Sequence, residues 1–220
     1  MNWKQLLLLI VVVFGLNACG GEYESGFRYV AVETEFGVME FKLYNSTPQH
    51  RDNFIKLIKE DFYEGLLFHR IMPEFMAQGG DPKSKGAGPE VQLGGSGPGY
   101  TLEKEFGALH YKGALAAARQ PDQVNPKKES SGSQFYIVQG KTWTDAELAQ
   151  IQKRGGFEYS PEQIDLYKTL GGTPFLDNDY TVFGECVKGL EIIDLLCAVP
   201  INQGSKRPIQ DVPMSVRVIK

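Results

Sequence analysis

Short apolar segments that recur between clusters of glycine and proline constrain the fold of this chain more than any other feature of its 220 residues. They are rich in β-branched and aromatic residues, which is typical of strands. The segments are Tyr29 to Thr34, Val38 to Leu43, Leu67 to Ile71, Phe75 to Gln78, Ala114 to Ala118, Gln134 to Val138, Tyr180 to Cys186 and Met214 to Ile219. Short strands at this spacing predict a mostly β domain, either a barrel or a sandwich.

The two ends of the chain are expected to meet in one sheet. The first two segments predict a hairpin around Glu35-Phe36-Gly37, since Met39, Phe41 and Leu43 alternate with polar residues. The last segment, Met214 to Ile219, also alternates and could pair with that hairpin. Such pairing would close a barrel and remove both exposed sheet edges.

Two helices are expected to cover the sheet. The first opens at Thr47-Pro48, a capping residue followed by proline, and places Phe54, Leu57 and Ile58 on one helical face. The second is the apolar run Leu190 to Leu196.

Residues 141 to 172 interrupt the β pattern with two further helical signals. Thr144-Asp145-Ala146-Glu147 is a capping box, and Gly155-Gly156 ends the helix that it opens. Ser160-Pro161-Glu162-Gln163 repeats the arrangement, and Gly171-Gly172 ends the second helix. We therefore expect a helical hairpin inserted between two strands.

Composition and charge exclude several classes of protein. With 42% hydrophobic and 23% charged residues the chain is globular. Its net charge is -4 and its 23 Lys and Arg residues are scattered, so we expect no nucleic acid partner. His50, His69 and His110 lack metal-ligand spacing, and Gly94 to Gly99 lacks the lysine of a phosphate loop. We expect neither a metal nor a cofactor.

The N-terminus has the pattern of a secretory signal. Lys4 precedes the apolar run Leu6 to Phe14, which is shorter than the ~20 residues of a membrane-spanning helix. Leu16-Asn17-Ala18-Cys19 resembles the bacterial lipobox, which implies cleavage before Cys19 and attachment of lipid to that residue. A retained transmembrane anchor is the alternative.

The lipobox resemblance divides the chain into three parts. They are a signal peptide at residues 1–18, a lipid-anchored tether at 19–27 and a folded domain at 28–220. We expect a monomer held by its lipid at a bacterial envelope membrane and facing the periplasm.

Cys186 and Cys197 would then remain in an oxidising compartment, where one disulfide is arithmetically possible. We prefer to interpret them as two small buried hydrophobic side chains. Cys186 follows a strand-like run and Cys197 closes a helical one, and nothing in their spacing brings them together.

One segment combines a cation, an amide and apolar residues on alternating positions. Residues 68 to 81 read FHRIMPEFMAQGGD, and they closely resemble the signature of the cyclophilins, a family of peptidyl-prolyl cis/trans isomerases. Further motifs match that family in the same order: Gly97 to Leu102, Gly113 to Arg119, Gly132 to Ile137, Phe175 to Asp177 and Val182 to Gly184.

The resemblance extends from Tyr29 to Lys220, apart from the helical insert and a loop near Gln123 to Lys128 that is longer than usual. It implies a closed eight-stranded antiparallel β-barrel capped by two helices, in agreement with the strands and helices expected above. It also implies an enzyme that isomerises X-Pro bonds of proline-containing polypeptides, here during the folding of exported proteins.

The resemblance also implies site residues, position by position. Arg70 matches the family's catalytic arginine, and Phe75 and Gln78 complete the expected catalytic set. Residues expected to bind substrate are Met76, Ala118, Gln134, Tyr136, Phe175, Leu176 and Tyr180. Departures from the family are Tyr136 for Phe, Phe175 for the Trp of many eukaryotic members, Tyr180 for their His and Arg119 for Asn. Because cyclosporin binding in the family depends on that Trp, we expect weak inhibition.

These residue types suit the reaction. An X-Pro bond isomerises over a barrier of ~18–20 kcal/mol because amide resonance must be broken, and no nucleophile is required. An apolar pocket can hold the proline ring while Arg70 donates to the proline nitrogen of the twisted amide. A proline-binding scaffold module without catalysis, with the insert as its interface, remains the alternative function.

Overall fold

The computed structural model describes residues 23 to 220, so the expected signal peptide and Cys19 lie outside the described residues. Eight strands form one antiparallel sheet in the order β10-β1-β2-β9-β6-β8-β4-β3, and β5 pairs separately with β7. The strands are β1 (Arg28–Thr34), β2 (Gly37–Leu43), β3 (Arg70–Met72), β4 (Met76–Gly79), β5 (Thr101–Leu102), β6 (Ala114–Ala117), β7 (Ser130–Ser131), β8 (Phe135–Val138), β9 (Val182–Lys188) and β10 (Ser215–Val218).

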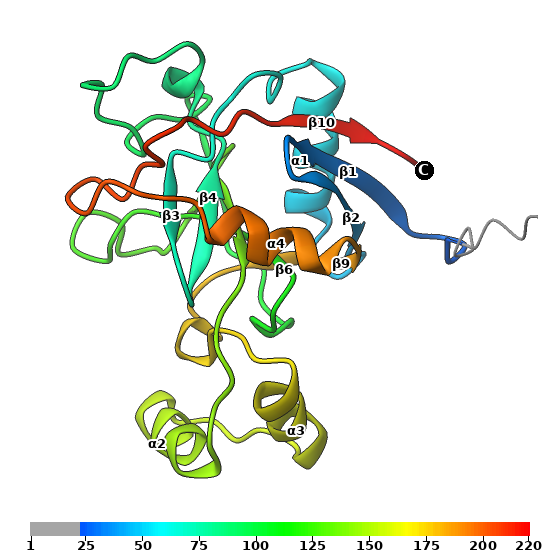
Figure 1. Ribbon diagram of the computed structural model, residues 1–220. Coiled ribbons are helices and arrows are strands. Elements are labelled where there is room, and N and C mark those ends of the chain that lie inside the picture. Colours follow the sequence, from blue (N-terminus) through cyan, green and yellow to red (C-terminus); the bar gives the residue numbers. More distant parts are fainter. Residues whose placement is uncertain (1–22) are drawn as a thin grey trace, which may run out of the picture.

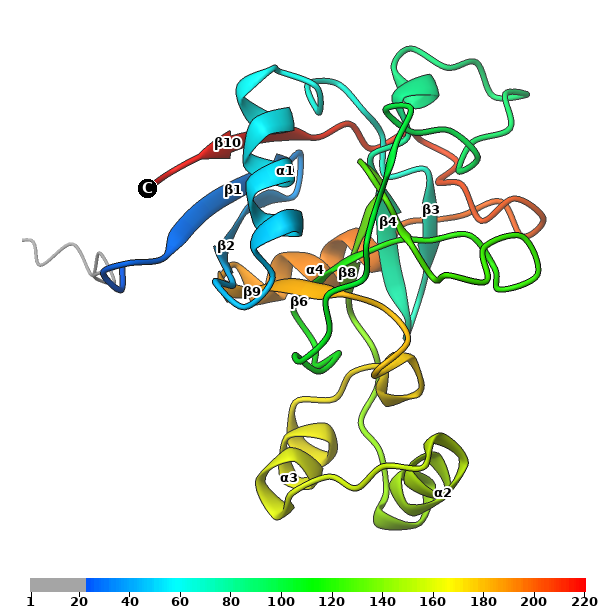
Figure 2. The same ribbon diagram turned by 180° about the vertical axis from the view of Figure 1, so that it is seen from behind.

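The four α-helices begin and end close to the predicted positions. They are α1 (Pro48–Lys59), α2 (Asp145–Gly155), α3 (Pro161–Thr169) and α4 (Leu190–Cys197), with short 3-10 turns η1 (Pro82–Ser84) and η2 (Pro174–Leu176). Helix α4 is nearer the viewer in Figure 1 and α1 in Figure 2, so they cover opposite ends of the curled sheet. Helices α2 and α3 project as a separate lobe (Figure 1). No helix between residues 23 and 220 has the length and apolar character needed to cross a membrane.

The predicted meeting of the two chain ends is confirmed, but the closed barrel is not. Strand β1 pairs with both β2 and β10. The edge strands β3 and β10 do not pair along their length, and the segments leading into them meet at one bridge between Leu67 and Pro213. Around that bridge the backbone N–H of Phe68 donates to Val212 and that of Met214 donates to Leu66, and no ladder between β3 and β10 follows it. The sheet is therefore a strongly curled half-barrel rather than a closed eight-stranded barrel.

The N-terminus of α1 is capped by a residue distant in the sequence. Thr47 precedes the helix as expected, but its side chain makes no capping hydrogen bond. The carboxylate of Glu105 instead accepts from the backbone N–H of Gln49 at 3.2 Å and of His50 at 3.0 Å. An anion at this position satisfies free helix donors and opposes the positive end of the helix dipole.

Alternation along β6 and β8 separates two apolar clusters. Leu115 and Phe135 belong to the main core, which α1 and α4 also line. Ala116 and Tyr136 belong to a second cluster on the other face of these strands. Because successive side chains of a strand point to opposite faces, Phe135 lies in the main core and Tyr136 lies in the second cluster.

The lobe of α2 and α3 has a small core of its own. Its buried members are Leu148, Tyr159 and Tyr167, and both predicted capping boxes are formed. The lobe follows β8 and precedes β9, as expected for an insert between strands.

The two cysteines of the described chain are free thiols. Cys197 is buried in the main core, while Cys186 is half-buried beside it. The possible disulfide is therefore not formed, and the interpretation as small apolar side chains holds fully for Cys197 and in part for Cys186.

Candidate active site

A row of side chains crosses four neighbouring strands on the groove face of the sheet. The antiparallel register places Arg70 of β3 opposite Gln78 of β4, Gln78 opposite Tyr136 of β8, and Tyr136 opposite Ala116 of β6. Directly paired residues point to the same face of a sheet. The pleat therefore brings a cation, an amide and an aromatic ring side by side, although they are far apart in the sequence.

Beside this row lies a small cavity of about 150 Å³. It is lined by Arg70, Phe75, Met76, Gln78, Ala118, Arg119, Tyr136, Leu176 and Tyr180. Eight of the ten residues expected in the groove are thus brought together around it. Six of the nine lining residues are apolar or aromatic and three are polar. This mixture suits a small apolar ring that is part of a polar backbone.

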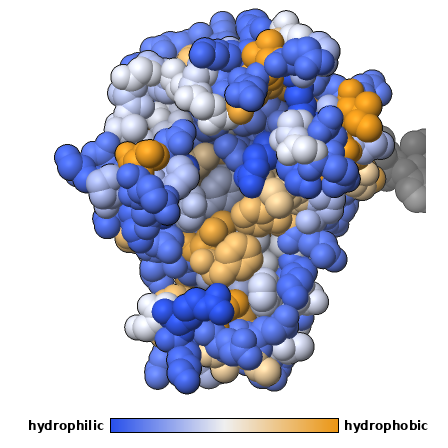
Figure 3. All heavy atoms as spheres, turned by 90° about the vertical axis from the view of Figure 1, so that its left-hand side faces the viewer, coloured by the Kyte–Doolittle hydropathy of each residue, from blue (hydrophilic) through white to orange (hydrophobic). Residues whose placement is uncertain are grey.

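The other two expected groove residues lie next to this cavity. Gln134 lies behind Gln78 and lines a neighbouring cavity. Phe175 is 48% exposed and packs on Phe75, with ring centroids 5.7 Å apart. Apolar surface is visible in Figure 3 on the face of the molecule that lies to the left in Figure 1, above the insert lobe.

The guanidinium group of Arg70 is oriented without being neutralised. Its Nη1 donates to Oε1 of Gln78 at 3.1 Å, and its Nη2 lies 3.1 Å from the sulfur of Met72. Within the described chain its hydrogen-bond partners are this amide oxygen and two methionine sulfurs, with no carboxylate among them. Burial lowers the pKa of Arg70 from its usual value, but a guanidinium remains charged at neutral pH. The positive charge is available to a ligand.

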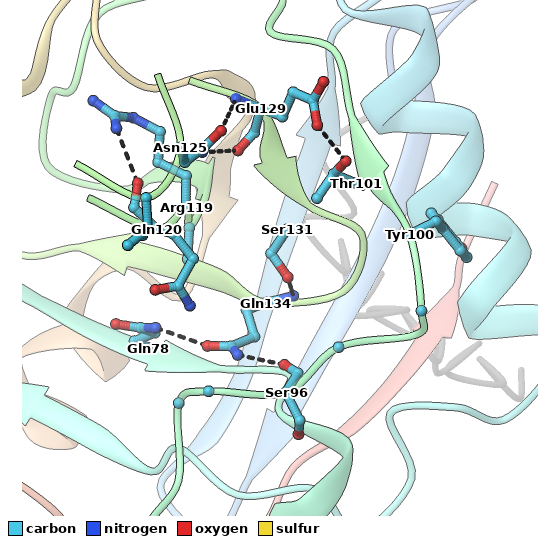
Figure 4. A pocket seen from close by; sticks show the side chains of 16 residues that line it. Gln78, Ser96, Tyr100, Thr101, Arg119, Gln120, Asn125, Glu129, Ser131 and Gln134 are labelled. Atoms are coloured by element: carbon cyan, nitrogen blue, oxygen red, sulfur yellow. Dashed lines mark hydrogen bonds between the residues drawn. The ribbon is translucent and has the colours of Figure 1, made fainter. Parts of the chain in front are cut away.

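A chain of amides continues from Arg70 along the groove. Gln78 donates through Nε2 to Oε1 of Gln134 at 2.9 Å, and Gln134 donates to the backbone oxygen of Ser96 at 2.6 Å (Figure 4). Because the Nε2 of Gln78 donates to Gln134, the Oε1 of Gln78 is the end of this amide that faces the guanidinium of Arg70.

The second cavity, of about 530 Å³, adjoins the first and shares Gln78, Ala118 and Arg119 with it. One of its walls is the backbone of residues 94–97 and another is the loop that carries Asn125 (Figure 4). Together the two cavities form one groove along the sheet.

The buried carboxylate of Asp81 holds the 94–97 wall in place. It accepts hydrogen bonds from the backbone N–H of Gly94 at 2.5 Å and of Lys83 at 2.8 Å, and from the hydroxyl of Ser96. Burial alone would raise the pKa of Asp81, but the bonds from Ser96, Lys83 and Gly94 outweigh it and lower the pKa. Asp81 therefore stays ionised and keeps the loop ordered.

Sequence reasoning placed Arg119 outside the binding set, although it lines both cavities. Its guanidinium lies over the ring of Tyr180, 4.4 Å from the centroid, and its Nε donates to the backbone oxygen of Asp179 at 3.0 Å. The feature of the sequence that could have indicated this role is the position of Arg119 directly after Ala118, at the end of a strand that lines the groove.

Two further buried residues behind the groove, His110 and Asp177, were also missed. His110 Nε2 lies 2.9 Å from the hydroxyl of Tyr136, and His110 Nδ1 lies 2.8 Å from Oδ1 of Asp177. The two are 67 positions apart in the sequence, so no local pattern pairs them.

Comparison with known proteins places the chain among relatives of one kind. The family model described as "Cyclophilin type peptidyl-prolyl cis-trans isomerase/CLD" matches residues 29–218. A Staphylococcus aureus protein described as "Putative peptidyl-prolyl cis-trans isomerase" is 35% identical over 192 residues, covering 87% of this chain and 91% of that protein. A protein of the same description from Staphylococcus haemolyticus is 36% identical over 187 residues, covering 83% and 86%.

Solved structures show the same fold at lower sequence identity. A cyclophilin type peptidyl-prolyl cis-trans isomerase of Cryptosporidium parvum superimposes with a TM-score of 0.63 at 23% identity, covering 88% of this chain and 98% of that one. A second structure of that protein, in the presence of the dipeptide Ala-Pro, gives a TM-score of 0.62 at 22% identity, with coverage of 87% and 99%.

Proposed function

The chain belongs to the cyclophilin-type peptidyl-prolyl cis-trans isomerases, and from this premise we propose that its groove catalyses the isomerisation of X-Pro bonds in extended polypeptides. The observation that carries the assignment is the small cavity in which apolar and aromatic side chains lie beside the charged group of Arg70. We assign catalysis to Arg70, Phe75 and Gln78. Substrate binding is assigned to Met76, Ala118, Gln134, Tyr136, Phe175, Leu176 and Tyr180.

The reaction requires that the twisted amide be bound more tightly than either planar isomer. Rotation about the C–N bond ends amide resonance, and the proline nitrogen then regains a lone pair. In this proposal the Arg70 guanidinium donates a hydrogen bond to that lone pair. Because the group is half-buried and not neutralised by a carboxylate, the contact is stronger than it would be in water.

The apolar walls supply the second part of catalysis. Phe75, Met76 and Leu176 would hold the proline ring, so that one side of the bond stays fixed while the carbonyl side rotates. The amides of Gln78 and Gln134 would bind the substrate backbone. The residues on one side of the proline would occupy the larger cavity, which continues from Ala118 and Arg119.

We further propose that the enzyme acts on exported proteins at a bacterial cell envelope. The support is the sequence Leu16-Asn17-Ala18-Cys19, which resembles a lipobox and follows an apolar run with Lys4 before it. In this proposal Cys19 carries the lipid, residues 19–27 form the tether, and the domain faces the periplasm as a monomer.

The assignment is tested with a short Ala-Pro peptide whose cis/trans exchange is followed by NMR. Acceleration by the purified chain supports the proposal. Saturable binding without acceleration would replace it with the proline-binding scaffold module, in which the insert lobe becomes the interface to investigate.

A further inference from the structure

A buried carboxylate connects the insert lobe to the groove. Asp177 directly follows η2, and its side chain is fully shielded from solvent. Its Oδ1 accepts from the backbone N–H of His110 at 2.8 Å and lies 2.8 Å from Nδ1 of the same residue. Its Oδ2 accepts from the hydroxyls of Tyr159 at 2.6 Å and Tyr167 at 2.5 Å, both from the insert. Four donors thus converge on one carboxylate.

This arrangement determines the donor and acceptor roles of the next residues. An imidazole that donates from Nδ1 to Asp177 can accept a hydrogen bond at Nε2. The hydroxyl of Tyr136 lies 2.9 Å from Nε2, and the two rings are inclined by only 9°. Burial raises the pKa of Tyr136 well above its usual value, so the hydroxyl keeps a proton that it can donate to Nε2. A continuous chain of hydrogen bonds therefore runs from the insert through Asp177 and His110 to Tyr136, which lines the small cavity.

The two tyrosines of the insert also act as hydrogen-bond donors. Burial, reinforced by the nearby charge of Asp177, raises the pKa of Tyr159 and of Tyr167 above the usual value. Both hydroxyls are donors at any physiological pH. The hydroxyl of Tyr159 also lies 3.2 Å from the backbone oxygen of Pro174, whereas Asp177 is the one partner of the Tyr167 hydroxyl within the described residues. Turning the carboxylate would leave that buried hydroxyl without a partner, which is costly.

We propose that His110 and Asp177 are positioning residues of the isomerase and that the insert supports the proline pocket through them, an inference that rests on the proposed function. The insert tyrosines fix the carboxylate, the carboxylate fixes the imidazole, and the imidazole holds the ring of Tyr136. That ring meets Tyr180 edge-on, with centroids 6.0 Å apart, so two pocket walls depend on its orientation. Small displacements of groups that orient a substrate have large effects on rate.

A cycle of tyrosine-to-phenylalanine substitutions in the full chain tests this coupling, with kcat/KM for a proline peptide and the unfolding temperature as readouts. Tyr159→Phe with Tyr167→Phe should lower kcat/KM by about threefold to tenfold. In a Tyr136→Phe background the same pair should change kcat/KM less than about twofold, while still lowering the unfolding temperature, because the link to the pocket is already cut.

Tyr111→Phe is the matched control. The Tyr111 ring packs on Tyr167 with centroids 4.5 Å apart, but its hydroxyl has no hydrogen-bond partner in the described chain. Its removal should leave kcat/KM unchanged. In parallel, the ¹⁵N shifts of His110 should report an Nδ1-protonated ring whose Nε2 resonance moves in Tyr136→Phe.

The results distinguish a failure of the coupling from a failure of the proposed function. Equal losses of kcat/KM from the insert substitutions in both backgrounds, or no loss in either, would overturn the coupling while leaving the isomerase intact. If the unmodified chain does not accelerate exchange, the proposed function fails instead. In that case the same set of variants is compared by the dissociation constant of the proline peptide. The proposal then requires the insert substitutions to weaken binding in the unmodified background and to have little effect in the Tyr136→Phe background.

Discussion

Arg70 faces Gln78 across the β3–β4 pair, and the guanidinium donates to the amide oxygen at 3.1 Å. A neutral amide orients the arginine through a single hydrogen bond. A carboxylate at the same place would form a charge-assisted pair and consume the charge. The choice of glutamine at position 78 therefore leaves Arg70 both fixed and available to the substrate.

Gln78→Glu should lower kcat/KM by about tenfold or more, because the new carboxylate pairs with Arg70 in a half-buried site. The fold should be retained, since the two side chains have the same shape. Gln150→Glu, which adds the same charge on the exposed surface of α2, is the control and should have no effect. Equal activity of both variants would contradict the role of the unpaired charge.

The stability of the fold should depend on pH through His69. This residue is 3% exposed and neither ring nitrogen has a hydrogen-bond partner within residues 23–220. Burial lowers its pKa to about 4, although the charge of Asp81 acts in the opposite direction. The pKa of an unfolded histidine is about 6.5. The unfolded state therefore takes up a proton first, so stability is fully present above pH 6.5 and is lost as the pH falls toward 4.

The expected contribution of His69 is a loss of about 2 kcal/mol in the free energy of unfolding between pH 7 and pH 5. Urea titrations at both pH values measure it. His69→Phe should reduce the dependence, whatever its effect on the absolute stability, while His50, whose pKa burial also lowers, keeps a part of it. An unchanged slope in that variant would show that another group carries the effect.

Cyclosporin should inhibit this enzyme weakly, because Phe175 occupies the position where the sequence resemblance leads us to expect Trp in many relatives. Phe175 is half-exposed beside Phe75 and can offer a ligand only a small ring. Phe175→Trp should strengthen inhibition by about tenfold through the larger aromatic surface. Titration of cyclosporin against both forms checks this, and strong inhibition of the unmodified chain would refute it.

Cys19→Ser should release the protein from membranes in cells that process lipoproteins. The lipid chains supply the membrane affinity in our account, and a serine cannot carry them through a thioether. Fractionation of cells expressing each form measures the effect. If the variant remains in the membrane fraction, the N-terminal segment is itself an anchor.

Much of the sheet could be predicted because the strands alternate so regularly. Met39, Phe41 and Leu43 face the core as expected, and Tyr136 points away from Phe135. The strands β5 and β7 have only two residues each, too few to show a period. Closure was overestimated because the alternation in Met214 to Ile219 gives no information about Pro213, where the pairing with the β3 side is limited to one bridge.

The candidate site could be predicted only where it follows a linear motif. Arg70 and Gln78 belong to one segment, and the resemblance identified both. The support behind the pocket joins His110 to Asp177 and to Tyr136, which lie 67 and 26 positions away from it in the sequence. Such long-range contacts between polar side chains leave no periodic trace in a single sequence.

The most direct test of the account is the cis/trans exchange rate of an Ala-Pro peptide in the presence of the purified chain and of its Arg70→Ala variant. We expect fast exchange with the former and a loss of about 10²–10³ in kcat/KM with the latter, since one preorganised donor is removed. Arg51→Ala, which removes a surface arginine paired with Asp52, should behave as the unmodified chain does. Undiminished exchange in Arg70→Ala would contradict the central claim that this guanidinium stabilises the twisted amide.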